Sequence, residues 1–119
     1  MTNNILADYL NKTDDELYIV LGYELLGDGL GIGTGDDDKY RKFGLTWFNN
    51  KRRQLQQKLC LHPRLRGLAI TSSGDAAAEA AALFEILQDL GESTPNAAVI
   101  AVLVSRLGLG AFCAGVTPA

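Results

Sequence analysis

The stretch from residue 97 to residue 107 most constrains how this chain can fold, because it is apolar almost all round. A helix without a polar face must be covered on every side by other elements. Thr94 and Pro95 precede it as an N-cap and a proline at the first helical position, and Gly108 follows as a stop signal. Its β-branched residues would also suit a buried strand. The cap chemistry and the flanking alanines favour a central helix.

Residues 14–26 are predicted to form an amphipathic helix. Thr13 and Glu16 match a capping box, in which the Thr13 hydroxyl accepts a hydrogen bond from the Glu16 amide and the Glu16 carboxylate reaches back. Apolar residues then follow at helical spacing. A shorter helical turn is expected just before, around residues 5–10.

Two further helices are predicted in the middle of the chain. Residues 39–61 are the longest candidate, and Pro63 restricts the residue before it, so the helix should end near residue 61. Residues 76–90 follow a capping cluster of serine, glycine and aspartate, and Gly91 suits the position just after a helix.

These segments predict an all-α fold, a compact domain of about four helices, with a glycine-rich loop between the first and second main helices. The loop, residues 27–38, has glycine at every second position from Gly27 to Gly35, which makes regular structure entropically costly. It is expected to be flexible and to end in aspartates that cap the next helix. A chain of 119 residues fits one domain, so residues 1–119 should form a single helical domain.

The cysteines and the N-terminus bear on the compartment. Cys60 and Cys113 do not form a CxxC pair, so they do not indicate a zinc site. We expect two reduced, buried thiols. The N-terminus lacks the basic and apolar regions of a signal peptide. A cytoplasmic location is therefore predicted.

Residues 97–115 are the most apolar part of the chain, but they do not predict a membrane span. Arg106 and three glycines interrupt them. They hold about ten strongly apolar side chains, whereas a spanning helix needs about 20 predominantly apolar residues. No membrane partner is expected.

No motif in the chain predicts catalysis or a cofactor. The glycine-rich loop matches neither the Walker nor the dinucleotide-binding pattern. Asp28 and Asp36–Asp38 could gather Ca²⁺ or Mg²⁺, but their spacing is not that of an EF-hand and capping explains most of them. Cys60 and His62 are two apart, so on a helix they do not face each other. We expect no catalytic residue, no metal, no cofactor and no small-molecule substrate.

The strongest functional signal is the basic segment, residues 39–66. It holds nine of the 11 lysines and arginines, and all 14 acidic residues lie outside it. Such asymmetry suggests an anionic partner. Its cations are Lys39, Arg41, Lys42, Lys51, Arg52, Arg53, Lys58, Arg64 and Arg66. Its aromatic residues, which could supply either core or contact surface, are Tyr40, Phe43, Trp47 and Phe48.

A helical projection shows that these cations surround the helix instead of sharing one face. With Tyr40 at zero and about 100° per residue, they fall in three groups: Lys39, Lys42 and Arg53 at about 200–260°, Arg41 and Arg52 at about 100–120°, and Lys51 and Lys58 at about 0–20°. A DNA-reading helix would keep one face apolar and one basic. Either the helix bends near Gly44 or residues 49–50, or it protrudes and packs against acidic surface of this chain or of another copy.

One group of residues resembles small helical accessory proteins of bacterial multi-component conflict (defence) systems. The resemblance covers residues 44–113 and implies an adaptor or interaction module without an active site. It assigns no functional residue. The residues that carry it, around an alanine-rich helix, are Trp47, Arg53-Gln54-Leu55, Leu59-Cys60, Thr94-Pro95, Ala98, Val102-Leu103-Val104, Gly108-Leu109 and Phe112-Cys113.

The sequence therefore predicts a non-enzymatic protein-interaction module. Residues 39–66 would contact an acidic protein partner or a second copy of the chain. Three alternatives remain: pairing of the cations with acids within the fold, nucleic-acid binding through the same cations, and a metal-dependent enzyme that uses the aspartates of residues 28–38. The whole-chain pI of about 5.0 argues against general nucleic-acid binding.

Overall fold

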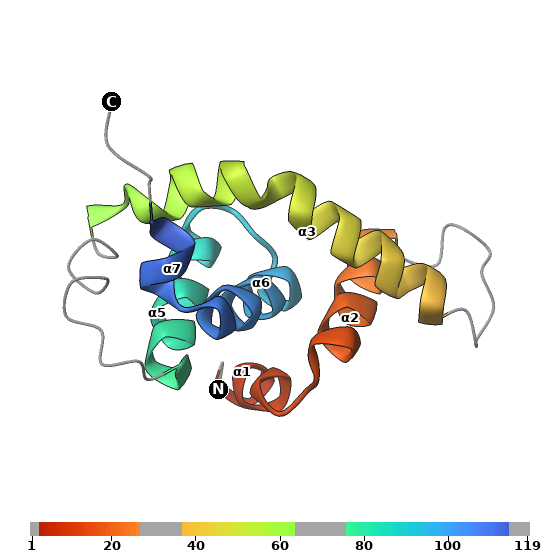
Figure 1. Cartoon of the computed structure of the whole chain (residues 1–119). Coiled ribbons are helices and arrows are strands. Elements are labelled where there is room, and N and C mark those ends of the chain that lie inside the picture. The colour runs from red at the N-terminus through yellow and green to blue at the C-terminus, as the bar shows by residue number, and fades with distance from the viewer. Residues whose placement is uncertain (1–2, 27–36, 64–75, 115–119) are drawn as a thin grey trace.

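The computed structural model describes residues 3–26, 37–63 and 76–114, and all the regular structure in these ranges is helical (Figure 1). The prediction of a compact all-α fold is confirmed for this part of the chain. Residues 27–36 of the predicted glycine-rich loop lie outside the described residues, as do Arg64, Arg66 and the predicted capping cluster before residue 76. The helices are α1 (Asn3–Leu10), α2 (Asp14–Leu26), α3 (Asp37–Cys60), α5 (Ala76–Asp89), α6 (Thr94–Leu107) and α7 (Leu109–Cys113).

Helix α6 forms the centre of the fold, where α1, α2, α5 and α7 pack against it, and the long α3 lies across the top of the view in Figure 1. All its residues from Ala97 to Ser105 are buried. The choice of helix over strand is confirmed, but the N-cap lies one residue earlier than predicted. The Ser93 hydroxyl accepts from the Asn96 amide at 3.4 Å, while the Thr94 hydroxyl accepts from Gln88 at 3.2 Å.

The ends of α2 and α5 follow the local chemistry predicted for them. The Thr13 amide donates to Glu16 Oε1 at 2.9 Å and the Glu16 amide donates to Thr13 Oγ1 at 3.1 Å, which is the predicted capping box. At the end of α5, Gly91 has a φ of +101°. Its amide donates to the Gln88 carbonyl and the next amide donates to the Leu87 carbonyl, the Schellman pattern that glycine favours.

Helices α2 and α3 cross with their backbones in direct contact at two glycines. A Cβ on Gly22 would overlap the Tyr40 carbonyl oxygen, and one on Gly44 would overlap the Tyr18 carbonyl oxygen. Gly44 is therefore the site of close helix packing, and α3 continues through it to Cys60. The helix is unbroken at Gly44 and at residues 49–50, and Figure 1 shows it as one curved helix.

The C-terminal end of α6 is fastened to the turn between α1 and α2 by Arg106. Its guanidinium lies 2.6 Å from Asp14 Oδ1 and donates to the carbonyl oxygens of Leu10 and Lys12. A guanidinium has enough donors to satisfy carbonyl groups left open at a helix end. Arg106 thus interrupts the apolar stretch of α6 because it holds three helices together.

The prediction of two reduced thiols is wrong, because Cys60 and Cys113 form a disulfide with 5.5 Å between their Cα atoms. The bond joins the end of α3 to α7, and the two cysteines are 53 residues apart in the sequence. Their spacing in the sequence therefore gave no indication that they pair. Disulfides persist mainly in oxidising compartments, so the thiols no longer support the cytoplasmic location, which stays a prediction. Among the described residues, no helix has the length and apolar character needed to cross a bilayer.

Candidate interaction surface and pocket on helix α3

Helix α3 meets four environments around its circumference, and its cations lie on three of them. Its inner side is buried and carries Tyr40, Gly44, Phe48, Leu55 and Leu59. The outward side is exposed, one flank lies near α7, and the other flank lines a pocket. The cations that surround α3 in the helical projection therefore belong to separate sites in the tertiary structure.

The outward side presents Lys39, Lys42 and Arg53, all exposed. Lys42 Nζ lies 3.2 Å from Asp38 Oδ2, and Arg41 Nη2 lies 2.8 Å from Asp38 Oδ1. Both contacts lie within α3, one at i,i+3 and the other at i,i+4. They therefore do not pair these cations with the acidic residues of other helices. Within the described ranges, Lys39 and Arg53 form no ion pair.

The Asp38 contacts shift the pKa values of both partners. Hydrogen bonds from Arg41 and then Lys42 hold the pKa of the Asp38 carboxyl below its ordinary value. The same contact raises the pKa of the Arg41 guanidinium. Asp38 and Lys42 are exposed and Arg41 is partly exposed, so solvent screens the interaction and its contribution to stability is small.

The flank facing α7 holds the second half of α3 in place. The guanidinium carbon of Arg52 lies 5.9 Å from the centroid of the Phe112 ring, and Gln56 Nε2 donates to the Phe112 carbonyl at 2.8 Å. Phe112 is fully buried. Arg52 therefore has a contact within the fold, which makes it less available to a partner than Arg53.

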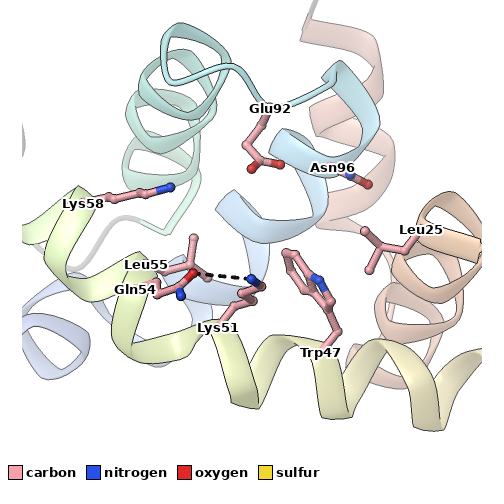
Figure 2. A pocket seen from close by; sticks show the side chains of 8 residues that line it. All are labelled: Leu25, Trp47, Lys51, Gln54, Leu55, Lys58, Glu92 and Asn96. Atoms are coloured by element: carbon pink, nitrogen blue, oxygen red, sulfur yellow. Dashed lines mark hydrogen bonds between the residues drawn. The ribbon is translucent and has the colours of Figure 1, made fainter.

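The opposite flank of α3 lines a pocket of about 320 Å³ together with the end of α2 and the turn between α5 and α6 (Figure 2). Lys51 and Lys58, which the projection placed on the same side of the helix as Tyr40, point into this space instead of into the core. Lys51 Nζ lies 3.4 Å from Gln54 Oε1. The lining residues are Leu25, Trp47, Lys51, Gln54, Leu55, Lys58, Glu92 and Asn96.

The aromatic residues of the basic segment divide between core and surface. Tyr40 and Phe48 are buried, at 6% and 2% exposure, and each contacts an aromatic ring of α2. Trp47 is partly buried at the pocket, and Phe43 is 38% exposed. Two of the four thus pack against α2, and two remain accessible.

Sequence reasoning missed the residues that complete the pocket from outside α3. Leu25, Glu92 and Asn96 come from α2, the α5–α6 turn and the first turn of α6. No motif links them. The one available signal was that Lys51 and Lys58 lie on the same side of the helix as Tyr40. Two lysines on that side indicated that the second half of α3 is not fully covered by the core.

The described residues hold no group of three or more histidines, cysteines or acids that could bind a metal ion. Asp28 and Asp36, which the metal hypothesis needs, lie outside the described ranges. Cys60 is in a disulfide and so cannot act as a nucleophile beside His62.

No family model, no curated protein and no solved structure shows detectable similarity to this chain. The resemblance to helical accessory proteins therefore stays a prediction, and the function must be argued from the surface itself.

Proposed function

We propose that this protein is a non-enzymatic interaction module that binds an acidic protein surface through the outward side of α3. The observation that supports the proposal most strongly is the exposure of Lys39, Lys42 and Arg53 without an acidic partner from another described helix. Charge pairing within the fold, the main alternative from the sequence, does not account for Lys39 and Arg53 in the described part of the chain, and it pairs Lys42 only with an acid of its own helix.

A second copy of the chain is one acidic surface that fits. Exposed acids lie on α1 and α2, namely Asp8, Asp14, Asp15, Glu16 and Glu24. The basic side of α3 in one copy could face these acids in the next. Because α2 packs beside α3, a two-fold dimer can satisfy this contact reciprocally, and a contact between separate surfaces would instead produce a ring or an open chain.

Charge reversal at Arg53 tests the proposal without disturbing the fold, because this side chain makes no contact with a described residue that would stabilise it. We expect Arg53→Glu with Lys39→Glu to abolish self-association in sedimentation velocity, or capture of the acidic partner by the purified protein. Ala81→Glu, which adds a negative charge at an exposed position of α5 outside both proposed surfaces, should leave both unchanged. The interaction should also weaken with added salt, since exposed charges are screened.

Two results would contradict this function. If the protein is monomeric at high concentration and its captured partners cross-link to surfaces other than α3, the proposed surface is wrong. If the same cations instead bind short DNA or RNA, with an affinity that falls linearly on a log–log salt plot, the nucleic-acid alternative replaces it.

A further inference from the structure

The pocket beside α3 brings together charged groups of both signs that do not contact one another. The Lys51 and Lys58 ammonium groups and the Glu92 carboxylate point into the same space (Figure 2). None of the three forms an ion pair with a described residue. Opposite charges that share a pocket without meeting leave room for a molecule that carries both counter-charges.

Three of the other five lining residues are apolar, and Gln54 and Asn96 are polar. The Trp47 ring lies between Lys51 and the side chain of Leu25, and Leu55 forms part of the α3 wall (Figure 2). A volume of about 320 Å³ lies within the range of small-molecule sites and would hold about ten waters. Apolar walls with a few convergent polar groups are typical of pockets that bind a small organic molecule.

One further polar group lies at the Glu92 end of the pocket. Asn96 Oδ1 is buried and accepts no hydrogen bond from the described residues. A buried acceptor without a donor costs free energy. Figure 2 draws this oxygen on the side of Asn96 away from Glu92, so Glu92 is the group that would hold a ligand ammonium, which a simple anion lacks.

We propose that this pocket binds a small zwitterion with an apolar group, of which a free aromatic or branched aliphatic amino acid is the simplest example. The carboxylate lies between Lys51 and Lys58, the ammonium group faces Glu92, and the side chain packs against Trp47, Leu25 and Leu55. Charge-assisted hydrogen bonds at both ends give the orientation. This site is separate from the outward side of α3, so it does not depend on the proposed protein contact.

The fluorescence of Trp47 reports on this pocket directly, because it is the chain's one tryptophan. We would titrate the full-length protein with phenylalanine and with leucine, and confirm the affinities by calorimetry. Phenylpropionate, which lacks the ammonium group, and phenethylamine, which lacks the carboxylate, test the two charged ends. We expect saturable binding of at least one amino acid, and affinity lower by about tenfold or more for each analogue, because each loses a hydrogen bond to a charged group.

Variants then assign each end of the ligand to its residues. Glu92→Gln should weaken binding of the amino acid but not of phenylpropionate, while Lys51→Met with Lys58→Met should weaken binding of both. Lys39→Met, on the outward side of α3, is the matched control and should bind like the wild type. Thermal unfolding followed by circular dichroism verifies that each variant is folded, and Lys51→Gln with Lys58→Gln replaces the methionine pair if that pair unfolds.

Three outcomes would overturn the proposal: no saturable response to either amino acid at millimolar concentration, phenylpropionate binding as tightly as phenylalanine, or unchanged affinity in the double lysine variant. The second outcome would identify a site for simple anions. A loss of amino-acid binding leaves self-association untouched, and a loss of self-association by Arg53→Glu leaves this pocket intact, so the two proposals fail separately.

Discussion

The two halves of α3 are held to the rest of the protein in different ways. The first half crosses α2 so closely that backbone meets backbone at Gly22 and Gly44, with Tyr40 and Phe48 buried around the crossing. The second half is held by Leu55, Leu59 and a few specific bonds to α7. A helix packed continuously has no space beside it, whereas a helix held at separate points leaves a flank open. The pocket lies on that flank.

The largest expected effect is at the crossing. Gly44→Ala would place a methyl group into the Tyr18 carbonyl, and neither backbone can yield without separating the two helices. We expect a net loss of about 4 kcal/mol in the free energy of unfolding, at the upper end for overpacking, even though alanine favours the helix by about 1 kcal/mol. Urea denaturation measures it.

Gly110→Ala is the matched control, because a Cβ there meets nothing within 4 Å and the residue is also helical. It should be neutral or stabilising by up to about 1 kcal/mol. Equal effects at Gly44 and Gly110 would show that the close crossing does not exist in solution.

The second half of α3 should depend on the disulfide. Cys60→Ser with Cys113→Ser removes a link between residues 53 apart, and the greater freedom of the unfolded chain should cost about 3 kcal/mol. Denaturation of the oxidised wild type against the double variant measures the loss. Reductant should lower the wild type to the same stability and leave the variant unaffected. Two free thiols in the protein as purified from its native compartment would restore the original prediction of reduced cysteines.

A smaller effect is expected where one hydrogen bond joins α3 to α7. Gln56→Ala removes the donor to the Phe112 carbonyl, for a loss of about 1 kcal/mol. Gln57→Ala, at the exposed neighbouring position, should change stability by less than about 0.5 kcal/mol. If both variants behave alike, the second half of α3 depends on the disulfide and its leucines alone.

The smallest effect is a pH dependence on the α2 side of the crossing. Hydrogen bonds from Thr13 hold the pKa of Glu16 below its ordinary value. The charged form therefore contributes stability above the ordinary glutamate pKa, and this is lost as pH falls through the lowered pKa. Glu16→Gln keeps the capping geometry without the charge. We expect the wild type to melt slightly higher at neutral pH and the difference to vanish in acid. A difference that grows in acid would contradict the sign.

Local chemistry accounts for most of the secondary structure that was predictable. The Thr13 capping box, the Gly91 terminus and the Gly108 stop each act within a few residues, so their sequence patterns identify helix ends. Ser93 and Thr94 are both suitable caps, and the local pattern did not separate them: Ser93 caps α6, while the Thr94 hydroxyl accepts from Gln88 on α5.

The candidate surface was predictable only as a set of residues. The sequence identified the cations of α3 and their arrangement around the helix. It did not show which of them are paired with Asp38, held against Phe112 or directed into a pocket. Those differences come from α2, α7 and the α5–α6 turn, which approach α3 from distant parts of the chain.

By itself, then, the sequence determined that this chain forms helices around a buried apolar helix and that its positive charge is concentrated in one segment, because periodicity, caps and charge are properties of neighbouring residues. The tertiary structure decided the glycine crossing, the Cys60–Cys113 bond, the role of Arg106 and the presence of the pocket. Each of these depends on groups far apart in the sequence coming within a few ångströms, and only the packing of the helices sets those distances.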